Sequence, residues 1–353
     1  MLFNPIEHTT VFLSYDEPNC EENYQHLLTL NPNSLRVHGV KGSDKAHKEC
    51  AKLSQTNNII IVDGDNFVKP DFYTTFELPD TISLSNSILS YSGNNSINGT
   101  QYGNGGIKVW PINVISNMKT HEASEGKHQV DFDYHSYIEL NTVGSDVHIH
   151  ITPLQAFRAG FREGVKLCLE DDLPATWERM DKYNFDRLWM WMHVGIDINN
   201  GLYAIYGARL GAYLTLYENF DYLQIRDFDY LNNLFNNIDL SDIDTLGNKL
   251  AHPLITNVLT IEDSKRIRGN YINPKRSKYP VYQSSDFIEW AESYREAAKM
   301  SDENILNKMC SIGSSEPFGI SKMLGARAGR NFNESSYRLY DYDWLKENYD
   351  RLH

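Results

Sequence analysis

The sequence predicts an α/β fold in which a mostly parallel sheet is followed by a mainly helical C-terminal lobe. Three short apolar runs alternate with two segments of helical character before residue 66. A βαβαβ order of this kind is typical of parallel sheets. Beyond about residue 175, Trp, Met, Leu and Tyr recur at helical spacing, which predicts helices. The 353 residues are enough for two such parts, and we expect one domain at 1–172 and a second at 173–353.

The N-terminal elements are predicted from the places where the apolar runs stop. The run at 10–14 (TVFLS) ends in a polar loop that contains Pro18, which predicts a buried strand. Strands are also expected at 35–40 and 58–62, with helices at 21–30 and 44–54 between them. In a parallel sheet, ligands bind beyond the carboxyl ends of the strands, where this sequence places acids and glycines.

Between residues 81 and 217, composition and alternation predict the structural elements. Ser, Asn and Gly dominate residues 81–110, which predicts a long loop or hairpin turns. Residues 147–151 (VHIHI) alternate like a strand, and 153–169 has the pattern of an amphipathic helix with Pro153 near its first turn. The segment 183–217 is apolar enough to form the core of the helical lobe.

Composition narrows the function classes. No run approaches the roughly 20 apolar residues that cross a bilayer, and the N-terminus lacks the pattern of a secretory signal, so we expect a cytoplasmic protein without a membrane partner. Four scattered cysteines suggest neither a zinc cluster nor a disulfide framework. The net charge of −14 argues against a surface that attracts nucleic acid everywhere. A local basic groove is still compatible with that charge.

The most informative motif is IIIVDGDNF at residues 59–67. It brings Asp63 and Asp65 to the expected ligand edge of the sheet, directly after the most apolar strand. Carboxylate oxygens suit Mg²⁺ or Mn²⁺, and such a cation would neutralise a diphosphate leaving group. The alternative is an ordinary turn at the end of a strand, but the preceding strand and helix pattern favours the metal site.

Residues 10–73 resemble the opening half of a GT-A (Rossmann-like) glycosyltransferase of the family 2 type. The resemblance implies a glycosyltransferase that uses a UDP-sugar as donor and Mn²⁺ or Mg²⁺ as cofactor. It assigns the metal to Asp63 and Asp65, within the Asp-x-Asp element that also includes Gly64. The nucleotide-binding residues that it implies are Ser14, Tyr15, Asp16, Glu17, Gly42, Lys45, Asp63 and Gly64.

Two further roles follow from the same resemblance. GT-A enzymes often complete the metal shell with a histidine from a late strand, so His148 or His150 is the expected third ligand. An inverting enzyme needs a carboxylate base for the acceptor hydroxyl, and Asp133 is our choice among the acids of 131–139. A retaining enzyme would need no such base, and the sequence leaves both courses open.

The segment GNGGIKVWP at 103–111 is similar to the acceptor-side loop of these enzymes. Gly105 and Gly106 would allow the backbone to approach a sugar, and Trp110 would stack on it. The alternative is a hairpin whose tryptophan belongs to the core. The sequence supports both interpretations equally.

A basic tract at 265–278 (KRIRGNYINPKRSK) contains no acid. Arg266, Arg268, Lys275 and Arg276 would contact a phosphate backbone there, and the alternative is a solvated basic loop. The Asn- and Tyr-rich composition of the chain, together with IIIVDGDN at 59–66 and GNGGIKVWP at 103–111, also resembles glycosyltransferases of T-even-like bacteriophages, including DNA arabinosyltransferases. That resemblance implies double-stranded DNA with 5-hydroxymethylcytosine as acceptor, arabinose or glucose as the sugar, and the host cytoplasm as location. The alternatives are transfer to protein or polysaccharide, and a sugar-nucleotide-binding protein without catalysis.

Overall fold

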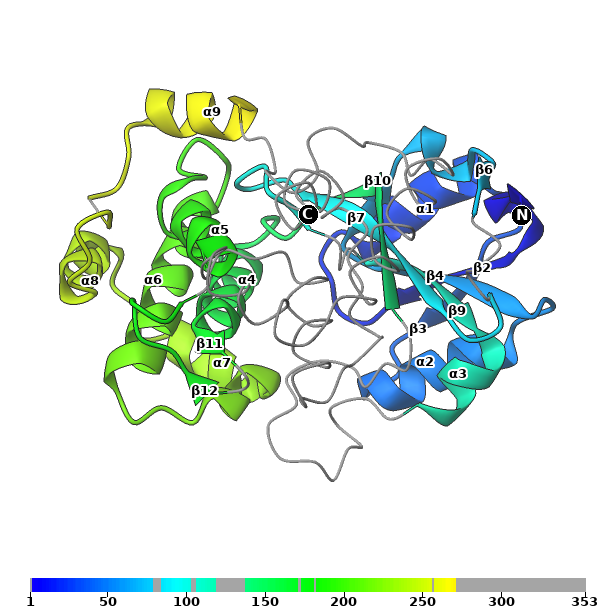
Figure 1. The fold of residues 1–353 in the computed structure, drawn as a ribbon, viewed down its shortest axis with the longest axis horizontal. Coiled ribbons are helices and arrows are strands. Elements are labelled where there is room, and N and C mark those ends of the chain that lie inside the picture. The colour runs from blue at the N-terminus through cyan, green and yellow to red at the C-terminus, as the bar shows by residue number, and fades with distance from the viewer. Residues whose placement is uncertain are drawn as a thin grey trace, which may run out of the picture.

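The computed structural model describes residues 2–78, 84–102, 106–118, 137–170, 173–180, 182–255 and 257–270. A sheet part and a helical part lie side by side (Figure 1). The sheet part contains β1 (Leu2–Phe3), the 3₁₀ helix η1 (Pro5–Glu7), β2 (Thr9–Ser14), α1 (Cys20–Leu30), β3 (Leu35–His38), α2 (Ser43–Lys52), β4 (Asn58–Asp63), β5 (Asn66–Val68), η2 (Pro70–Tyr73), β6 (Phe76–Glu77), β7 (Ile88–Asn95), β8 (Gln101–Tyr102), β9 (Ile107–Pro111), α3 (Ile112–Asn117) and β10 (Tyr137–Val147). The helical part contains α4 (Pro153–Leu167), β11 (Leu169–Glu170), β12 (Leu173–Pro174), α5 (Lys182–His193), α6 (Gly201–Tyr217), η3 (Tyr222–Arg226), α7 (Phe228–Phe235), η4 (Leu240–Asp242), α8 (Ile243–Lys249) and α9 (Ile261–Asn270).

The main sheet of the described residues is mixed. Its strand order is β3-β2-β4-β9-β7-β10-β5, and β8 pairs with β7. β2 runs parallel to β3 and β4, and β10 runs parallel to β7. β9 is antiparallel to both of its neighbours, and β5 is antiparallel to β10. The predicted βαβαβ unit is confirmed, whereas the prediction of a mostly parallel sheet is wrong and the Rossmann-like description fits only β3-β2-β4.

The antiparallel strand arises in the segment that was predicted as loop or hairpin. β7 is eight residues long and almost entirely buried, so Ser- and Asn-rich composition conceals a central strand. The connection from β7 to β9 is too short for a helical crossover, which is what parallel strands require. The chain therefore returns antiparallel, and Leu89 pairs with Val109.

The sheet is covered on both faces, and the central strand β4 is buried along almost its whole length. Val11 and Ile59 pack with Trp110 in one core cluster under α2 and α3. The next residue in β2, Phe12, points the other way and meets the ring of Tyr24 in α1, with ring centroids 5.4 Å apart. Figure 1 shows α1 on one side of the sheet and α2 with α3 on the other. This two-sided burial explains the continuous apolar run of β4.

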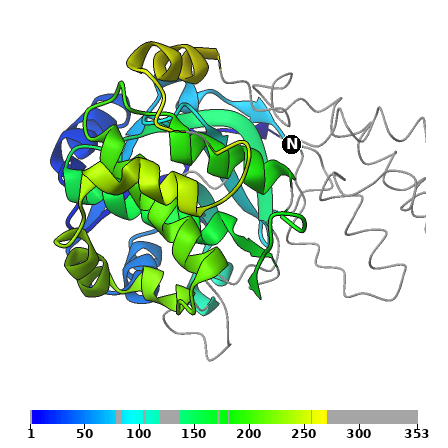
Figure 2. The same cartoon turned by 90° about the vertical axis from the view of Figure 1, so that its left-hand side faces the viewer.

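The helical part begins at α4, ahead of the predicted boundary at residue 172. Its first helix starts where Pro153 was expected to start it, and the side chain of Thr152 caps it by accepting from the backbone N–H of Gln155. The predicted strand at 147–151 is limited to its first residue, because β10 ends at Val147. Figure 2 looks onto the helical part (green), behind which the sheet part (blue and cyan) lies. Within the described residues, no helix combines the length and apolar character needed to cross a bilayer.

Helices α4 and α6 approach each other unusually closely because both are lined with glycine. A Cβ atom on Gly160 would lie 2.0 Å from the carbonyl oxygen of Ala204. From the other helix, a Cβ atom on Gly207 would lie 2.4 Å from the carbonyl oxygen of Phe157. In each case the neighbour is backbone, which cannot rotate away. The contact therefore needs glycine for its lack of a side chain.

We expect Gly160→Ala to destabilise the protein by about 1–3 kcal/mol, because the added methyl group forces two helix backbones apart. Gly269→Ala in α9 is the matched control, since nothing lies within 4 Å of a Cβ atom there. The control should be neutral or slightly stabilising, because alanine favours helix and reduces the entropy of the unfolded chain. Urea denaturation of both variants measures the difference, and equal midpoints would contradict the close contact.

Arg209 joins three helices from a position without solvent exposure. Its Nε donates to the carbonyl oxygen of Met192 at the end of α5 (3.0 Å), and its Nη1 donates to that of Ile243 in α8 (2.9 Å). The Asp244 carboxylate lies 3.4 Å from Nη1 and also accepts from the backbone N–H of Val258 at 2.8 Å. Arg209 therefore fixes α5 and α8 against α6.

Candidate functional site

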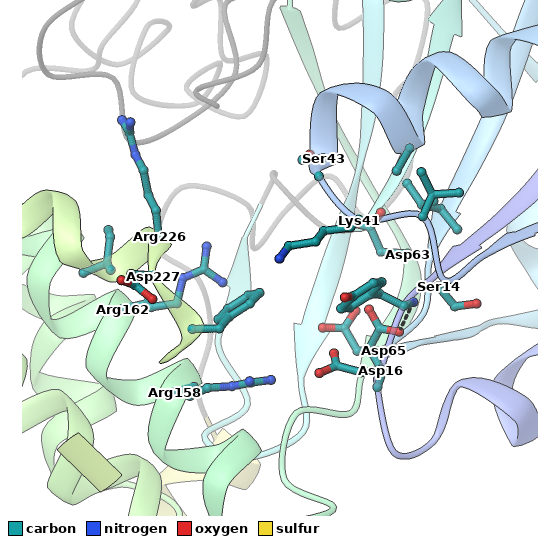
Figure 3. Close-up of a pocket in the computed structure, with 18 of the residues that line it drawn as sticks. Ser14, Asp16, Lys41, Ser43, Asp63, Asp65, Arg158, Arg162, Arg226 and Asp227 are labelled. Atoms are coloured by element: carbon teal, nitrogen blue, oxygen red, sulfur yellow. Dashed lines mark hydrogen bonds between the residues drawn. The ribbon is translucent and has the colours of Figure 1, made fainter. Parts of the chain in front are cut away.

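A cavity of about 820 Å³ lies between the carboxyl ends of β2, β3 and β4 and the facing helices α4 and α7. Figure 3 shows acidic side chains on the sheet side and arginines on the helix side. The volume lies within the range of about 300–1,000 Å³ that is usual for small-molecule sites. The lining residues are Leu13, Ser14, Tyr15, Asp16, Glu17, Val40, Lys41, Gly42, Ser43, Ala46, His47, Asp63, Asp65, Arg158, Arg162, Lys166, Ile225, Arg226, Asp227, Phe228, Asp229 and Asn232.

Both acids of the Asp-x-Asp element open onto this cavity (Figure 3). Hydrogen bonds from neighbouring residues hold the turn that carries both acids. The backbone N–H of Asp63 donates to the carbonyl oxygen of Gly106 at 2.8 Å. The amide of Asn66 donates to Asp65 Oδ1 at 2.7 Å, and its own Oδ1 accepts from the Ser145 hydroxyl at 2.5 Å. The Asp65 carboxylate is therefore oriented by a buried hydrogen-bond chain.

A side chain at position 64 would crowd the loop after β2. A Cβ atom on Gly64 would lie 2.6 Å from Glu17 Oε2 and 3.0 Å from the Cβ of Ser14. The Gly64 carbonyl accepts from the side-chain amide of Asn23 at 2.9 Å. Gly64 thus brings the loop after β2 against the tip of β4. Its contribution to the site is close approach of the backbone.

Three carboxyl groups repel one another at this edge. Burial is the main cause that raises the pKa of Asp65 to about 7, and the charges of Asp63 and Glu17 raise it further. Burial also raises the pKa of Asp63, although Lys108 opposes the shift. The pKa of Glu17 is raised first by burial, while the hydrogen bond from the backbone N–H of Tyr15 (2.7 Å) lowers it. A bound cation would relieve this repulsion.

The donor set fits a divalent cation that is only partly enclosed by protein. Within the described residues, no group of three or more His, Cys, Asp or Glu side chains is arranged to hold a metal ion. Mg²⁺ is usually bound by one or two carboxylates together with waters and substrate phosphates. Asp63 and Asp65 supply such a pair, so the residues present are compatible with Mg²⁺ or Mn²⁺.

The two histidines that were expected to complete the metal shell do not line the cavity. His148 is tied to the acidic turn through its backbone, whose N–H donates to the carbonyl oxygen of Asp65 at 2.8 Å. Its ring stacks on Phe67, with centroids 5.4 Å apart, and the His150 ring centroid lies 6.0 Å from that of His148. Both histidines follow the end of β10, so they do not lie on the strand that was predicted at 147–151. They pack beside the site.

Most of the predicted nucleotide-binding residues gather at the cavity. Ser14, Tyr15, Asp16, Glu17 and Gly42 come from two separate strand ends and all line it. The Tyr15 side chain is 42% exposed there. Gly42 has φ of 94° and precedes α2, so a residue with a side chain would be strained at this position. Lys45, in contrast, is exposed on α2 and is not part of the lining.

Two neighbouring side chains hold the Ser14 hydroxyl in place. It lies 2.9 Å from Nδ1 of His38 and accepts from Nε of Arg36 at 3.1 Å. The same guanidinium pairs with Glu21 at 2.6 Å and lies over the ring of Tyr24. This network stiffens the loop that follows β2.

The predicted acceptor loop is only partly described. Gly106 lies at the acidic turn, where a Cβ atom would be 2.1 Å from the Asn66 amide nitrogen and 2.8 Å from the Asp63 Cβ. Trp110 is fully buried in the core cluster under α2 and α3. Its place matches the core alternative, and it offers no surface to a sugar. Gly105 lies outside the described residues.

The basic tract is also engaged within the protein where it is described. Arg268 in α9 forms an ion pair with Asp197, and Arg266 pairs with Asp263 at 3.0 Å. Neither arginine lines the cavity. Lys275 and Arg276 lie outside the described residues, as does the predicted catalytic base Asp133.

The cationic wall of the cavity was not anticipated. Arg158, Arg162 and Lys166 follow one another at intervals of four residues in α4, and Arg226 joins them from η3. This spacing places the first three on one helix face. The signal was present in the helix predicted at 153–169, but the helix was interpreted only by its apolar side.

No model of a known protein family matches this chain, and no curated protein sequence matches it.

Proposed function

We propose that the protein is a metal-dependent glycosyltransferase that uses a nucleotide sugar, with UDP as the expected nucleotide. The observation that carries this proposal is that residues from three separate strand ends meet at one cavity. The acids Asp63 and Asp65 come from β4, Ser14 to Glu17 from the loop after β2, and Gly42 from the loop after β3. The proposed cation site and the proposed nucleoside site would therefore be adjacent, as a metal-chelated nucleoside diphosphate requires.

In the proposed reaction, the bond between the anomeric carbon and the diphosphate oxygen breaks, and a bond from that carbon to an acceptor oxygen forms. The acceptor hydroxyl loses its proton to a base, and the nucleoside diphosphate leaves. A cation held by Asp63 and Asp65 would stabilise the charge on this leaving group. Asn66 fixes the Asp65 carboxylate, and Lys41, which points across the cavity in Figure 3, would offset remaining negative charge.

The nucleoside would lie over the loops that follow β2 and β3. Tyr15 provides an exposed ring on which a base stacks. Ser14 offers a hydroxyl oxygen whose orientation is set by Arg36 and His38. A preorganised loop of this kind binds with a smaller loss of conformational entropy.

The proposed acceptor is a hydroxyl group, and the resemblance of the sequence favours 5-hydroxymethylcytosine in phage DNA, with arabinose or glucose as the sugar. In that case the host cytoplasm is the location. Transfer to protein or polysaccharide is the second candidate. A sugar-nucleotide-binding protein without turnover is the third. Salt-dependent DNA binding separates the first from the second, and hydrolysis of the donor separates both from the third.

The test is a thermal-shift screen with UDP-sugars in the presence and absence of Mn²⁺. A specific donor stabilises the folded state by mass action, so we expect one UDP-sugar to raise Tm strongly with Mn²⁺ and weakly without it. Release of UDP from that sugar then measures turnover. A screen in which no nucleotide sugar changes Tm in either condition would overturn the proposal.

A further inference from the structure

The cationic wall forms a continuous stripe on α4, with a neighbour on η3. Arg158 and Arg162 point from α4 toward the acidic strand ends in Figure 3, and Lys166, which also pairs with Glu163, continues the same face. Eight residues of helix separate Arg158 from Lys166, which corresponds to about 12 Å. Arg226 lines the cavity beside them. The stripe is the main concentration of positive charge that the described residues place at this site.

An aromatic ring supports the stripe. Phe228, at the start of α7, is 43% exposed and lines the cavity. The guanidinium carbon of Arg158 lies 4.6 Å from its ring centroid and that of Arg162 lies 5.9 Å from it. Cation–π contacts of this kind hold the two guanidinium groups over one ring. Phe228 thus acts as a positioning residue for the first half of the stripe.

The groups proposed to bind the donor lie on the wall that faces the stripe. A divalent cation would balance the two carboxylates of Asp63 and Asp65, and Lys41 on the same wall would meet the diphosphate. The stripe lies on the opposite wall, and its length of about 12 Å is enough to face more than one phosphate of a nucleic-acid strand. Arginine is suited to phosphate because its planar fork donates two hydrogen bonds.

We propose that the α4 stripe, formed by Arg158, Arg162 and Lys166 with Arg226, is a second phosphate subsite that binds the phosphodiester groups of the acceptor. The proposal rests on the proposed function, because it takes the sheet wall as the donor site. It also places acceptor binding at the cavity, which the described arginines of the predicted basic tract do not line. The net charge of −14 disfavours polyanion binding over the surface as a whole, so a polyanion needs a local cationic surface such as this one.

The test compares two probes on one variant. A short fluorescein-labelled oligothymidylate represents the acceptor phosphates, and UDP with Mn²⁺ represents the donor. We expect Arg158→Gln/Arg162→Gln to weaken oligonucleotide binding about tenfold or more and to reduce the salt slope by about 1.4, because each lost charge contributes about 0.7 for a single strand. Binding of UDP with Mn²⁺ should be unchanged, which also shows that the variant is folded.

The charge-matched control is Lys52→Gln/Arg179→Gln, which removes two exposed cations outside the cavity and should leave oligonucleotide binding intact. A Phe228→Leu variant should weaken the oligonucleotide to a smaller degree than the double arginine variant. Equal loss of oligonucleotide affinity in the control, or absence of binding by the wild type at low salt, would overturn the subsite. Loss of UDP affinity in the arginine variant would assign the stripe to the donor instead.

The two proposals fail in different ways. If the wild type binds the oligonucleotide through the stripe but never binds UDP with Mn²⁺, the donor site is wrong and the phosphate subsite remains. If Asp65→Asn removes UDP binding while the oligonucleotide still binds, both assignments hold. If UDP binds and the oligonucleotide does not, only the subsite is overturned.

Discussion

An Asp65→Asn variant is expected to lose the Mn²⁺-dependent binding of the donor and to reduce turnover about 100-fold or more, because the cation contributes several kcal/mol to the leaving group. The substitution keeps the shape of the side chain and its neighbour Asn66. Calorimetry with UDP and Mn²⁺ measures the binding loss. Retention of full metal-dependent activity would exclude Asp65 as a ligand.

The same variant should be more stable than the wild type when no metal is present. In the folded state, burial and the charges of Asp63 and Glu17 raise the pKa of Asp65 to about 7, whereas an unfolded aspartate has a pKa of about 4. The folded state therefore holds this proton more tightly, and the associated stability is lost as pH rises from about 4 through 7. The Asp65→Asn variant lacks this penalty, so we expect it to have a higher Tm than the wild type at about pH 8 and a vanishing difference near pH 4.

Two comparisons make this result specific to the acidic edge. Glu262→Gln removes an exposed acid from the first turn of α9, and surface changes of that kind usually alter stability by less than about 0.5 kcal/mol. Saturating Mn²⁺ with UDP should raise the Tm of the wild type and of Glu262→Gln but leave Asp65→Asn where it is. If Asp65→Asn were less stable than the wild type at about pH 8 without metal, burial and charge repulsion at Asp65 would not be the main effect on stability.

The acidic edge was predictable because it depends on local order along the chain. An apolar strand that ends in Asp63 and Asp65 brings both acids to the rim of a sheet, whatever the remaining strands do. The loops after β2 and β3 follow from the same alternation of strand and helix. The expected residues that line the cavity therefore come from the βαβαβ unit alone.

The rest of the site depends on contacts between distant segments. Whether β9 would be parallel could not be judged from its own residues, because its direction is set by the length of the connection from β7. The burial of Trp110 follows from that placement. Likewise, Arg158 faces the cavity because α4 packs on α6 through Gly160 and Gly207, a contact that no single segment reveals.

Arg268 shows that local composition does not reveal which basic residues pair with acids elsewhere in the fold. A run of basic residues predicted a surface for phosphate, yet the described arginines of the run are used by neighbouring acids. Asp197 accepts from Arg268 and also from the Ser264 hydroxyl at 2.8 Å, and that hydroxyl accepts from the backbone N–H of Gly195. Basic residues mark a binding surface only when the fold leaves their charge facing a ligand.

Replacement of Arg209 by alanine is expected to cost about 3–5 kcal/mol of unfolding free energy, the largest stability effect that we predict. The change leaves a large cavity where no solvent reaches. It also removes the hydrogen bonds that the Met192 and Ile243 carbonyl groups accept from the guanidinium, and a hydrogen bond to a charged group contributes roughly 1.5–3 kcal/mol. Burial lowers the pKa of Arg209 only to about 10, so the wild-type side chain carries its charge at neutral pH.

Urea denaturation of Arg209→Ala, beside Arg179→Ala as an exposed control, measures this cost. Arg209→Lys should recover part of the loss, since an ammonium group keeps the charge beside Asp244 but cannot reproduce both hydrogen bonds of the planar fork. Because α6 also supports α4, the alanine variant should weaken oligonucleotide binding before it unfolds, whereas UDP binding on the sheet wall should decline only with global unfolding. If oligonucleotide binding and UDP binding were lost together, the helical part and the sheet part would unfold as one unit. Arg209 would then stabilise the whole protein rather than the acceptor side alone.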